Sequence, residues 1–159
     1  MDRPKADSVL VLSGLDPSGA AGIAADIETI NQFGLTPLPI ITLLTAQNTQ
    51  KVESLEVTKN DLLEHQFKLI DEDIHFNTVK IGLLGSSSQI IAISNLIKNR
   101  KQLNIVLDPI LISGTNENLS SIKIMEAMKA HLFPLCLVLT PNLAELNALA
   151  PGLDEQAAV

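Results

Sequence analysis

The feature that most constrains the fold of this chain is the alternation of short apolar runs with segments of helical periodicity from one end to the other. A short apolar run is typical of a buried strand, whereas apolar residues spaced three and four apart are typical of a helix with one buried face. Such alternation predicts right-handed strand–helix–strand units, and therefore an α/β fold with a mostly parallel central sheet.

The pattern predicts the positions of the individual elements. Strands are expected at Val9–Ser13, Leu38–Leu44, Val52–Val57, Thr78–Leu84, Asn104–Leu107 and Leu135–Leu139, the third of them at a sheet edge. Helices are expected at Ala24–Phe33, Lys59–Asp71, Gln89–Asn99, Ser120–Ala130 and Asn142–Leu149. Gly34 is expected to stop the first helix, and the serines at 86–88 offer N-caps for the third. The second helix should bury the side chains of Leu62, Leu63, Phe67 and Ile70.

Composition narrows the class of protein further. Apolar residues make up 46% of the sequence and charged residues 18%, a composition that excludes a disordered chain. The length of 159 residues suffices for one domain with an apolar core. The net charge is −7 and no basic stripe is visible, so we expect no nucleic-acid partner. No apolar window reaches the length of a transmembrane helix, so we expect no membrane partner. The lone Cys136, in a predicted strand, indicates a small buried hydrophobe and a reducing, cytoplasmic location.

The loop after the first predicted strand, Gly14–Gly22, is rich in small residues that let a backbone approach a ligand closely. It is not a P-loop, because no Gly-Lys-Ser/Thr follows, and its glycine spacing differs from that of a dinucleotide-binding loop. A tight strand-to-helix turn without a ligand would have a similar composition, so both interpretations stay open. Asp26, one turn into the next helix, is equally consistent with a role at the helix dipole.

Two other strand ends carry suggestive residues. Gln47 follows the second strand, and its amide offers an acceptor and two donors that match the edge of an aminopyrimidine. A polar loop that satisfies its own backbone is the alternative interpretation. Gly82 and Gly85 flank an apolar strand end and are expected to form a pocket wall. Lys80, inside that strand, is expected to pair with a carboxylate, because an isolated buried charge is costly.

Acidic and amide side chains follow the last two predicted strands. Asp108 and Glu145 are candidate Mg²⁺ ligands, directly or through water. Asn142 and Glu145 also match a capping box, and the two interpretations are compatible because a capping Glu keeps a second carboxylate oxygen. The three histidines are scattered without metal-ligand spacing, and we expect them to be structural.

Taken together, these motifs resemble those of the hydroxymethylpyrimidine/phosphomethylpyrimidine kinases of thiamin biosynthesis, in the ribokinase-like superfamily. The matching segments occur in the family's order and cover essentially the whole chain: Ser13–Asp26, Thr45–Thr49, Val79–Leu84, Val106–Pro109 and Leu139–Glu145. The resemblance implies a three-layer α/β/α fold. It also implies a kinase that phosphorylates 4-amino-5-hydroxymethyl-2-methylpyrimidine, and then its monophosphate, with ATP and Mg²⁺.

The resemblance further implies roles for individual residues. The aminopyrimidine pocket would be lined by Gly14, Ala21, Asp26, Thr45 and Gln47, with Leu84 and Ile110 as apolar walls. Asp108 and Glu145 would hold the metal ion, and Asn142 and Glu145 would lie near the phosphates of ATP. No catalytic residue is assigned within this chain.

The last residues influence how the resemblance is interpreted. The segment after Pro151 and Gly152 starts like another helix, with Asp154 as its N-cap, so we expect the chain to end inside an element. Residues 1–159 would then be a single domain, the N-terminal, substrate-binding portion of such a kinase. The family's later Lys-Gly-Gly strand end, Gly-Thr-Gly-Cys anion-hole loop and adenine site have no counterpart in this sequence.

Two other functions stay open at this point. A non-catalytic pyrimidine-binding or regulatory module would keep the pocket motifs without the phosphate half. A kinase of B6 vitamers such as pyridoxal belongs to the same superfamily, although the Ala-Gln-Asn-Thr motif that contains Gln47 argues against it. An incomplete sheet exposes an apolar face and an unpaired edge, which favours association, for example into a homodimer.

Overall fold

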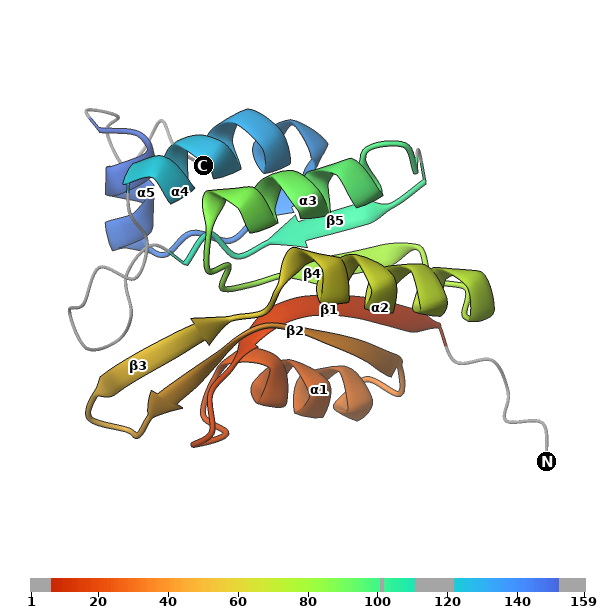
Figure 1. Ribbon diagram of the computed structural model, residues 1–159, viewed down its shortest axis with the longest axis horizontal. Helices are drawn as coiled ribbons and strands as arrows, with labels where there is room; N and C mark the ends of the chain where they lie inside the picture. Colours follow the sequence, from red (N-terminus) through yellow and green to blue (C-terminus); the bar gives the residue numbers. More distant parts are fainter. Residues whose placement is uncertain (1–6, 101, 111–121, 152–159) are drawn as a thin grey trace.

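The structure is a computed structural model that describes residues 7–100, 102–110 and 122–151. Within these residues the strands form a six-stranded sheet in the order β3-β2-β1-β4-β5-β6 (Figure 1). The strands are β1 Ser8–Leu15, β2 Thr36–Gln47, β3 Val52–Val57, β4 Thr78–Ile81, β5 Asn104–Leu107 and β6 Val138–Leu139. Neighbouring strands are parallel except β2 and β3, which form an antiparallel hairpin. The predicted α/β fold is confirmed, with β3 at the predicted edge.

Helices lie on both faces of the sheet, which produces three layers (Figure 1). Helix α1, Gly22–Gln32, packs on β1 and β2 on one face. The other face carries α2, α3 and α4, packed against one another in that order (Figure 1). These helices and the last one are α2 Asn60–Asp73, α3 Ser87–Ile97, α4 Ile122–Ala127 and α5 Leu143–Leu149. No helix in the described part of the chain is long and apolar enough to cross a membrane.

The main apolar core lies between the sheet and the layer of α2, α3 and α4. Every second residue of β1, β4 and β5 contributes to it, as the strand period of two requires. These residues are at most 3% exposed: Leu10, Leu12, Val79, Ile81, Ile105 and Leu107. The intervening residues face the α1 side; they include the fully buried Val11 and the polar groups described below.

Several helix ends follow the local signals in the sequence. Gly34 follows the C-cap of α1 in a left-handed conformation with φ of 73°, as predicted for a helix stop. The Ser86 hydroxyl caps α3 by accepting a hydrogen bond from the backbone N–H of Gln89 at 3.2 Å. Asn142 and Glu145 form the predicted capping box at the start of α5.

Other predicted details were wrong. In α2, Leu63 and Phe67 are buried, but Leu62 is 53% exposed and lies outside the apolar face. Strand β4 ends at Ile81, so the segment from Gly82 onward is a loop. The described part of the fourth helix changes after Ala127 into a π-helix, Met128–Leu132.

The prediction for Cys136 also needs correction. Residues Phe133–Leu135 form a 3₁₀ turn that contains Pro134, so β6 starts only at Val138 and Cys136 caps the turn instead of lying in a strand. Its thiol donates to the carbonyl oxygen of Leu132 at 3.1 Å, and burial raises the pKa of Cys136 to about 11. A half-buried neutral thiol agrees with the predicted role as a small hydrophobe.

The predicted helix start at Asp154 lies outside the described residues.

The strand order identifies the part of the sheet where a ligand fits best. From β1 the chain moves outward to β2 and β3, and then crosses to β4 on the other side of β1. The loop after β1 leads to α1 on one face, and the loop after β4 leads to α3 on the other (Figure 1). Where successive loops diverge to opposite faces, an open α/β sheet leaves a crevice at its carboxyl edge.

Candidate functional site at the carboxyl edge of the sheet

The loop after β1 is a tight turn that its own sequence specifies. The backbone N–H of Gly19 donates to the carbonyl oxygen of Asp16 at 3.1 Å, and the N–H of Ser18 donates to the Asp16 carboxylate at 2.8 Å. Pro17 has the φ that the second position of such a turn needs, and Gly19 adopts φ of 77°. The Asp-Pro-Ser-Gly sequence is therefore explained first as turn chemistry.

Asp16 connects this turn to the second strand. It is 7% exposed. Burial on its own would raise the pKa of Asp16, but hydrogen bonds from the side chains of Ser18 and Gln47 and from the backbone of Ser18 and Ala21 outweigh that effect. The pKa of Asp16 consequently lies below its usual value, so the carboxylate is ionised at neutral pH. The Gln47 side chain is one of the groups that lower this pKa, so it lies close to the Asp16 carboxylate.

Gly22 allows the loop to close against β1. Its φ is 60°, and a Cβ at this position would lie 2.4 Å from the carbonyl oxygen of Gly14. An isolated antiparallel bridge joins Gly22 to Leu15 at the same place. Because only glycine fits here, the start of α1, including Ala21, lies directly beside the end of β1.

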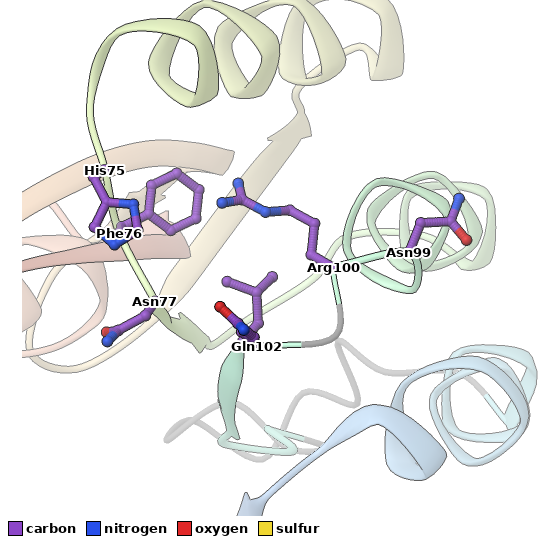
Figure 2. A pocket seen from close by; sticks show the side chains of 7 residues that line it. His75, Phe76, Asn77, Asn99, Arg100 and Gln102 are labelled. Carbon is purple, nitrogen blue, oxygen red and sulfur yellow. The ribbon is translucent and has the colours of Figure 1, made fainter.

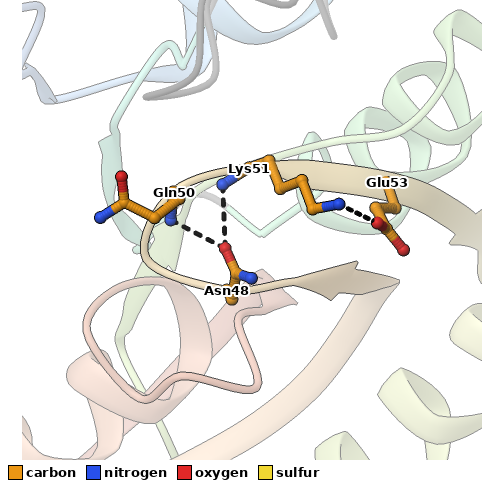
Figure 3. A network of polar contacts seen from close by, with 4 residues as sticks. All are labelled: Asn48, Gln50, Lys51 and Glu53. Carbon is orange, nitrogen blue, oxygen red and sulfur yellow. Dashed lines mark hydrogen bonds and ion pairs between the residues drawn. The ribbon is translucent and has the colours of Figure 1, made fainter.

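The β2–β3 hairpin forms the second wall of the site. The Thr45 hydroxyl donates to the carbonyl oxygen of Leu15 at 2.9 Å, which fastens β2 to the end of β1. At the hairpin turn, the Asn48 side-chain oxygen accepts from the backbone N–H groups of Gln50 at 2.8 Å and Lys51 at 3.0 Å (Figure 3). Lys51 in turn forms an ion pair with Glu53. These contacts fix the backbone on either side of Gln47.

A pocket of about 440 Å³ lies between the turn and the hairpin. It is lined by Pro17, Ala46, Gln47, Asn48, Lys51 and Glu53. Gln47 is half-buried, and its side chain also interacts with the Asp16 carboxylate. The predicted ligand-facing position of Gln47 thus coincides with a hollow in the structure.

A group of charged residues lies on the α1 side of β4 and β5. The Lys80 ammonium is 2.9 Å from the carboxylate Oδ2 of Asp26, and both side chains are about four-fifths buried. The prediction that Lys80 pairs with a carboxylate is therefore confirmed. Asp108, at the end of β5, is half-buried. Burial raises the pKa of Asp108, Lys80 lowers it, and the charges of Glu145 and Asp26 raise it again, so the net pKa is above the usual value.

Glu145 is 4% exposed, and its position comes from the capping box of α5. Its Oε2 accepts from the backbone N–H of Asn142 at 2.9 Å, and its own N–H donates to the Asn142 side-chain oxygen at 2.9 Å. The second carboxylate oxygen of Glu145 is not used by the capping box. The structural and functional interpretations of this motif are therefore compatible, as the sequence suggested.

Asp108 and Glu145 suit a hard cation in chemical type. Mg²⁺ is commonly held by one or two carboxylates together with water and substrate phosphates. Burial, and then the charges of Glu145 and Asp26, raise the pKa of Asp108, and a divalent cation would favour its ionised form. In the described residues, no cluster of three or more His, Cys, Asp or Glu side chains forms a complete metal site. The two carboxylates therefore fit a substrate-completed Mg²⁺ site, not a closed protein cage.

The predicted site residues fall into two groups. Gly14, Ala21, Thr45 and Gln47 meet around the loop after β1 and the β2–β3 hairpin. Asp26, Asp108, Asn142 and Glu145 gather around Lys80 and the start of α5. Leu84 is fully buried in the main core, so it would support a pocket from behind instead of touching a ligand. Ile110 is partly buried, and its N–H donates to the carbonyl oxygen of Asp108 at 2.9 Å.

One residue that positions the site was not found from the sequence. Gln89 is fully buried, its Nε2 donates to the carbonyl oxygen of Thr42 at 2.8 Å, and its Oε1 accepts from the N–H of Gly85 at 3.0 Å. The Thr42 hydroxyl donates to the carbonyl oxygen of Leu83 at 2.6 Å. These bonds tie the loop after β4 to β2. The only signal in the sequence was an amide in the first turn of a predicted helix, which usually faces water.

A second pocket lies at the opposite, amino edge of the sheet. It measures about 390 Å³ and is lined by His75, Phe76, Asn77, Asn99, Arg100, Gln102 and Leu103 (Figure 2). The Arg100 guanidinium lies 4.7 Å from the centre of the Phe76 ring and forms an ion pair with Asp71. Because these partners already neutralise and cover the guanidinium, its contacts are explained by packing.

Comparison with known proteins places these features in a family. The family model described as phosphomethylpyrimidine kinase matches residues 16–158. The hydroxymethylpyrimidine/phosphomethylpyrimidine kinase of Salmonella typhimurium is 33% identical over 142 residues, covering 89% of this chain and 53% of its own length. The Aquifex aeolicus protein of the same description is 35% identical over 140 residues, with coverages of 88% and 55%. The chain therefore spans about half the length of the curated relatives it matches.

Solved structures agree with this result. The phosphomethylpyrimidine kinase of Clostridium difficile superposes with a TM-score of 0.83 at 33% identity, covering 91% of this chain and 62% of that one. An ADP complex of Bacillus subtilis pyridoxal kinase superposes with a TM-score of 0.80 at 27% identity, with coverages of 94% and 55%. The predicted ribokinase-like architecture is confirmed.

Proposed function

Because the chain belongs to the phosphomethylpyrimidine kinase family, we propose that it serves in the ATP-dependent phosphorylation of 4-amino-5-hydroxymethyl-2-methylpyrimidine and of its monophosphate in thiamin biosynthesis. The observation that carries the proposal is the position of Gln47. Its amide lines the pocket at the carboxyl edge and is oriented by the ionised Asp16. A fixed amide is the group that distinguishes an aminopyrimidine edge from an apolar ring.

The pyrimidine side of the site consists of the loop after β1 and the hairpin. Gly14, Ala21, Thr45 and Gln47 are proposed to surround the pyrimidine ring, and Asp26 is proposed as a carboxylate acceptor for an N–H or O–H group. Of these residues, Gln47 lines the pocket, the Thr45 hydroxyl fastens β2 to the end of β1, and Asp26 is paired with Lys80. Leu84 and Ile110 are proposed as apolar support. The tight turn and the Asn48 contacts stabilise this wall before a ligand arrives, which lowers the entropic cost of binding.

The phosphate side of the site consists of the two carboxylates near α5. Asp108 and Glu145 are proposed to hold Mg²⁺, and Asn142 and Glu145 to lie near the phosphates of ATP. Bound Mg²⁺ would neutralise charge on the phosphoryl oxygens, which is the main requirement of phosphoryl transfer. The capping box keeps the Glu145 carboxylate at this edge whether or not a nucleotide is bound. We further propose a cytoplasmic location and a homodimeric assembly.

The proposal is tested by measuring pyrimidine binding and ATP-dependent phosphorylation with the purified protein, with the Salmonella typhimurium relative as a positive control. Replacing Gln47 by Leu is expected to weaken pyrimidine binding by roughly 1–3 kcal/mol, because polar atoms of the ligand lose their partner. Gln50→Leu is the matched control, since Gln50 is exposed in the same hairpin and only its backbone N–H makes a contact. Equal affinities of wild type and Gln47→Leu would refute the role of Gln47.

The same assay separates the two alternatives. Binding of the pyrimidine without any transfer from ATP would indicate a non-catalytic binding module. The likeness to a pyridoxal kinase structure is the observation that keeps a B6-vitamer kinase in consideration. That function would be favoured if the protein binds and phosphorylates pyridoxal in preference to the pyrimidine, and if Gln47→Leu does not change the affinity for pyridoxal.

A further inference from the structure

The ion pair between Lys80 and Asp26 has properties that simple packing of α1 does not require. Lys80 lies in β4, the central strand next to the switch point, whereas α1 packs on β1 and β2. Its chain neighbours Val79 and Ile81 point into the apolar core, and the Lys80 side chain extends along the opposite face to meet Asp26. The side chains are only 22% and 19% exposed, so removing one of them would leave the other charge largely buried without this partner.

Gly82, two residues after this lysine, leaves space for the Ser13 hydroxyl and for the end of the Lys80 side chain. A Cβ on Gly82 would lie 3.0 Å from the Lys80 ammonium and 2.4 Å from the Ser13 hydroxyl. Ser13 is fully buried, and its hydroxyl has no hydrogen-bond partner among the described residues. Gly82 therefore leaves a small polar niche between β1 and β4, directly at the switch point, and the ammonium lies at its border.

Among the described residues, the Asp26 carboxylate has a hydrogen-bond partner on one oxygen only. Lys80 donates to Oδ2 at 2.9 Å, and no described residue donates a hydrogen bond to Oδ1. A carboxylate that is anchored through one oxygen presents the other in a defined direction. It can accept a hydrogen bond from a neutral ligand without the loss of rotamer entropy that a free side chain would suffer.

We propose that Lys80 is a positioning residue that fixes Asp26 for the aminopyrimidine alcohol, beside a glycine at position 82 that leaves space for the Ser13 hydroxyl and the ammonium. This inference rests on the proposed function and deepens it. Lys80 does not touch the ligand; it acts through Asp26. Replacing Lys80 should therefore weaken ligand binding when Asp26 is present, and should have no further effect on binding when Asp26 has been replaced.

A double-mutant cycle on the purified chain tests this coupling, with calorimetric titration of 4-amino-5-hydroxymethyl-2-methylpyrimidine as the readout. Lys80→Met and Asp26→Asn are each expected to weaken binding roughly tenfold, the scale of one hydrogen bond to a charged group. The double variant should bind like Asp26→Asn alone. Lys80→Arg keeps a cation beside Asp26 and should lose less affinity than Lys80→Met. Lys68→Met is the matched control, because Lys68 forms an exposed ion pair with Glu72 and lies on the outer face of α2.

The outcomes separate a positioning role from a structural one. If Lys80→Met binds as tightly as wild type, or if the losses of the two single variants add in the double variant, the inference is overturned. The double variant removes both charges of the pair, so neither is left without its partner, and it still reports on the coupling if Lys80→Met alone proves unstable. A wild-type chain that does not bind the pyrimidine at all would instead refute the proposed function, and the inference with it.

Discussion

The two faces of the central strands differ in kind, although their residues are chain neighbours. On the face toward α2 and α3, Leu12, Ile81 and Leu107 are fully buried in the apolar core. The adjacent residues on the α1 side are Ser13, Lys80 and Asp108: a hydroxyl without a partner among the described residues, a cation, and a carboxylate with a raised pKa. Two consecutive residues of one strand can therefore have opposite effects: one stabilises the fold, and its neighbour on the other face lowers the stability.

This contrast indicates that one face of the sheet mainly stabilises the fold and the other holds the polar groups of the candidate site. Apolar area removed from water stabilises the folded state by roughly 25 cal/mol per Å². Buried polar groups without full hydrogen bonding cost free energy instead. The α2–α3 face therefore supplies the stability that allows the α1 face to keep charged groups at the switch point. Such groups are characteristic of functional sites.

The largest expected effect comes from the apolar face. Leu12→Ala should lower the free energy of unfolding by about 2–5 kcal/mol, because it removes a fully buried side chain and leaves a cavity. Leu69→Ala is the control, since Leu69 is 55% exposed and its loss should change stability by no more than about 0.5 kcal/mol. Urea denaturation measures both. Similar losses in the two variants would contradict the division between faces.

A smaller effect of opposite sign is expected at Asp108. Because the pKa of Asp108 is raised in the folded state, its ionised form disfavours folding at neutral pH. Asp108→Asn should therefore be more stable than wild type at pH 7. The gain should shrink as the pH falls through the raised folded-state pKa and vanish below the pKa of the unfolded chain. Denaturation at a series of pH values checks this sign, and a gain that grows toward acid would contradict it.

The smallest effect is expected at Ser13. Its hydroxyl has no described partner, so Ser13→Ala should leave the free energy of unfolding within about 0.5 kcal/mol of wild type, or raise it. Thr42→Val is the matched comparison, because that buried hydroxyl donates to Leu83 at 2.6 Å and its loss should cost about 1–3 kcal/mol. If Ser13→Ala proves as damaging as Thr42→Val, Ser13 has a partner that this structure lacks.

Much of the fold could be predicted because its signals are local. Gly34, Ser86 and the Asn142–Glu145 capping box act within a few residues of chain, so their roles were readable from the sequence. The bounds of β5 were predicted correctly for the same reason, since an apolar run ends at Asp108 and Pro109. Errors arose where tertiary packing decides, as for the exposed Leu62 and for the turn before Cys136.

The candidate site shows the same limit. The sequence predicted that Lys80 needs a carboxylate, but not that its partner is Asp26, 54 positions away in the chain. The sequence suggested that Gly82 belongs to a pocket wall. It did not show that a Cβ there would collide with Ser13 and crowd Lys80. The buried amide of Gln89, which ties β2 to the loop after β4, gave no distinctive signal.

The sequence by itself determined the alternation of strands and helices, the tight turn at Asp16, the helix caps and the membership of a kinase family, because each depends on residues close in the chain or on motifs in a fixed order. Only the tertiary structure decided which carboxylate meets Lys80, which leucines are buried, and that the charges of Asp26 and Glu145 help to raise the pKa of Asp108. The physical reason is that strand order and register bring distant residues together, and a one-residue shift in register exchanges the two faces of a strand.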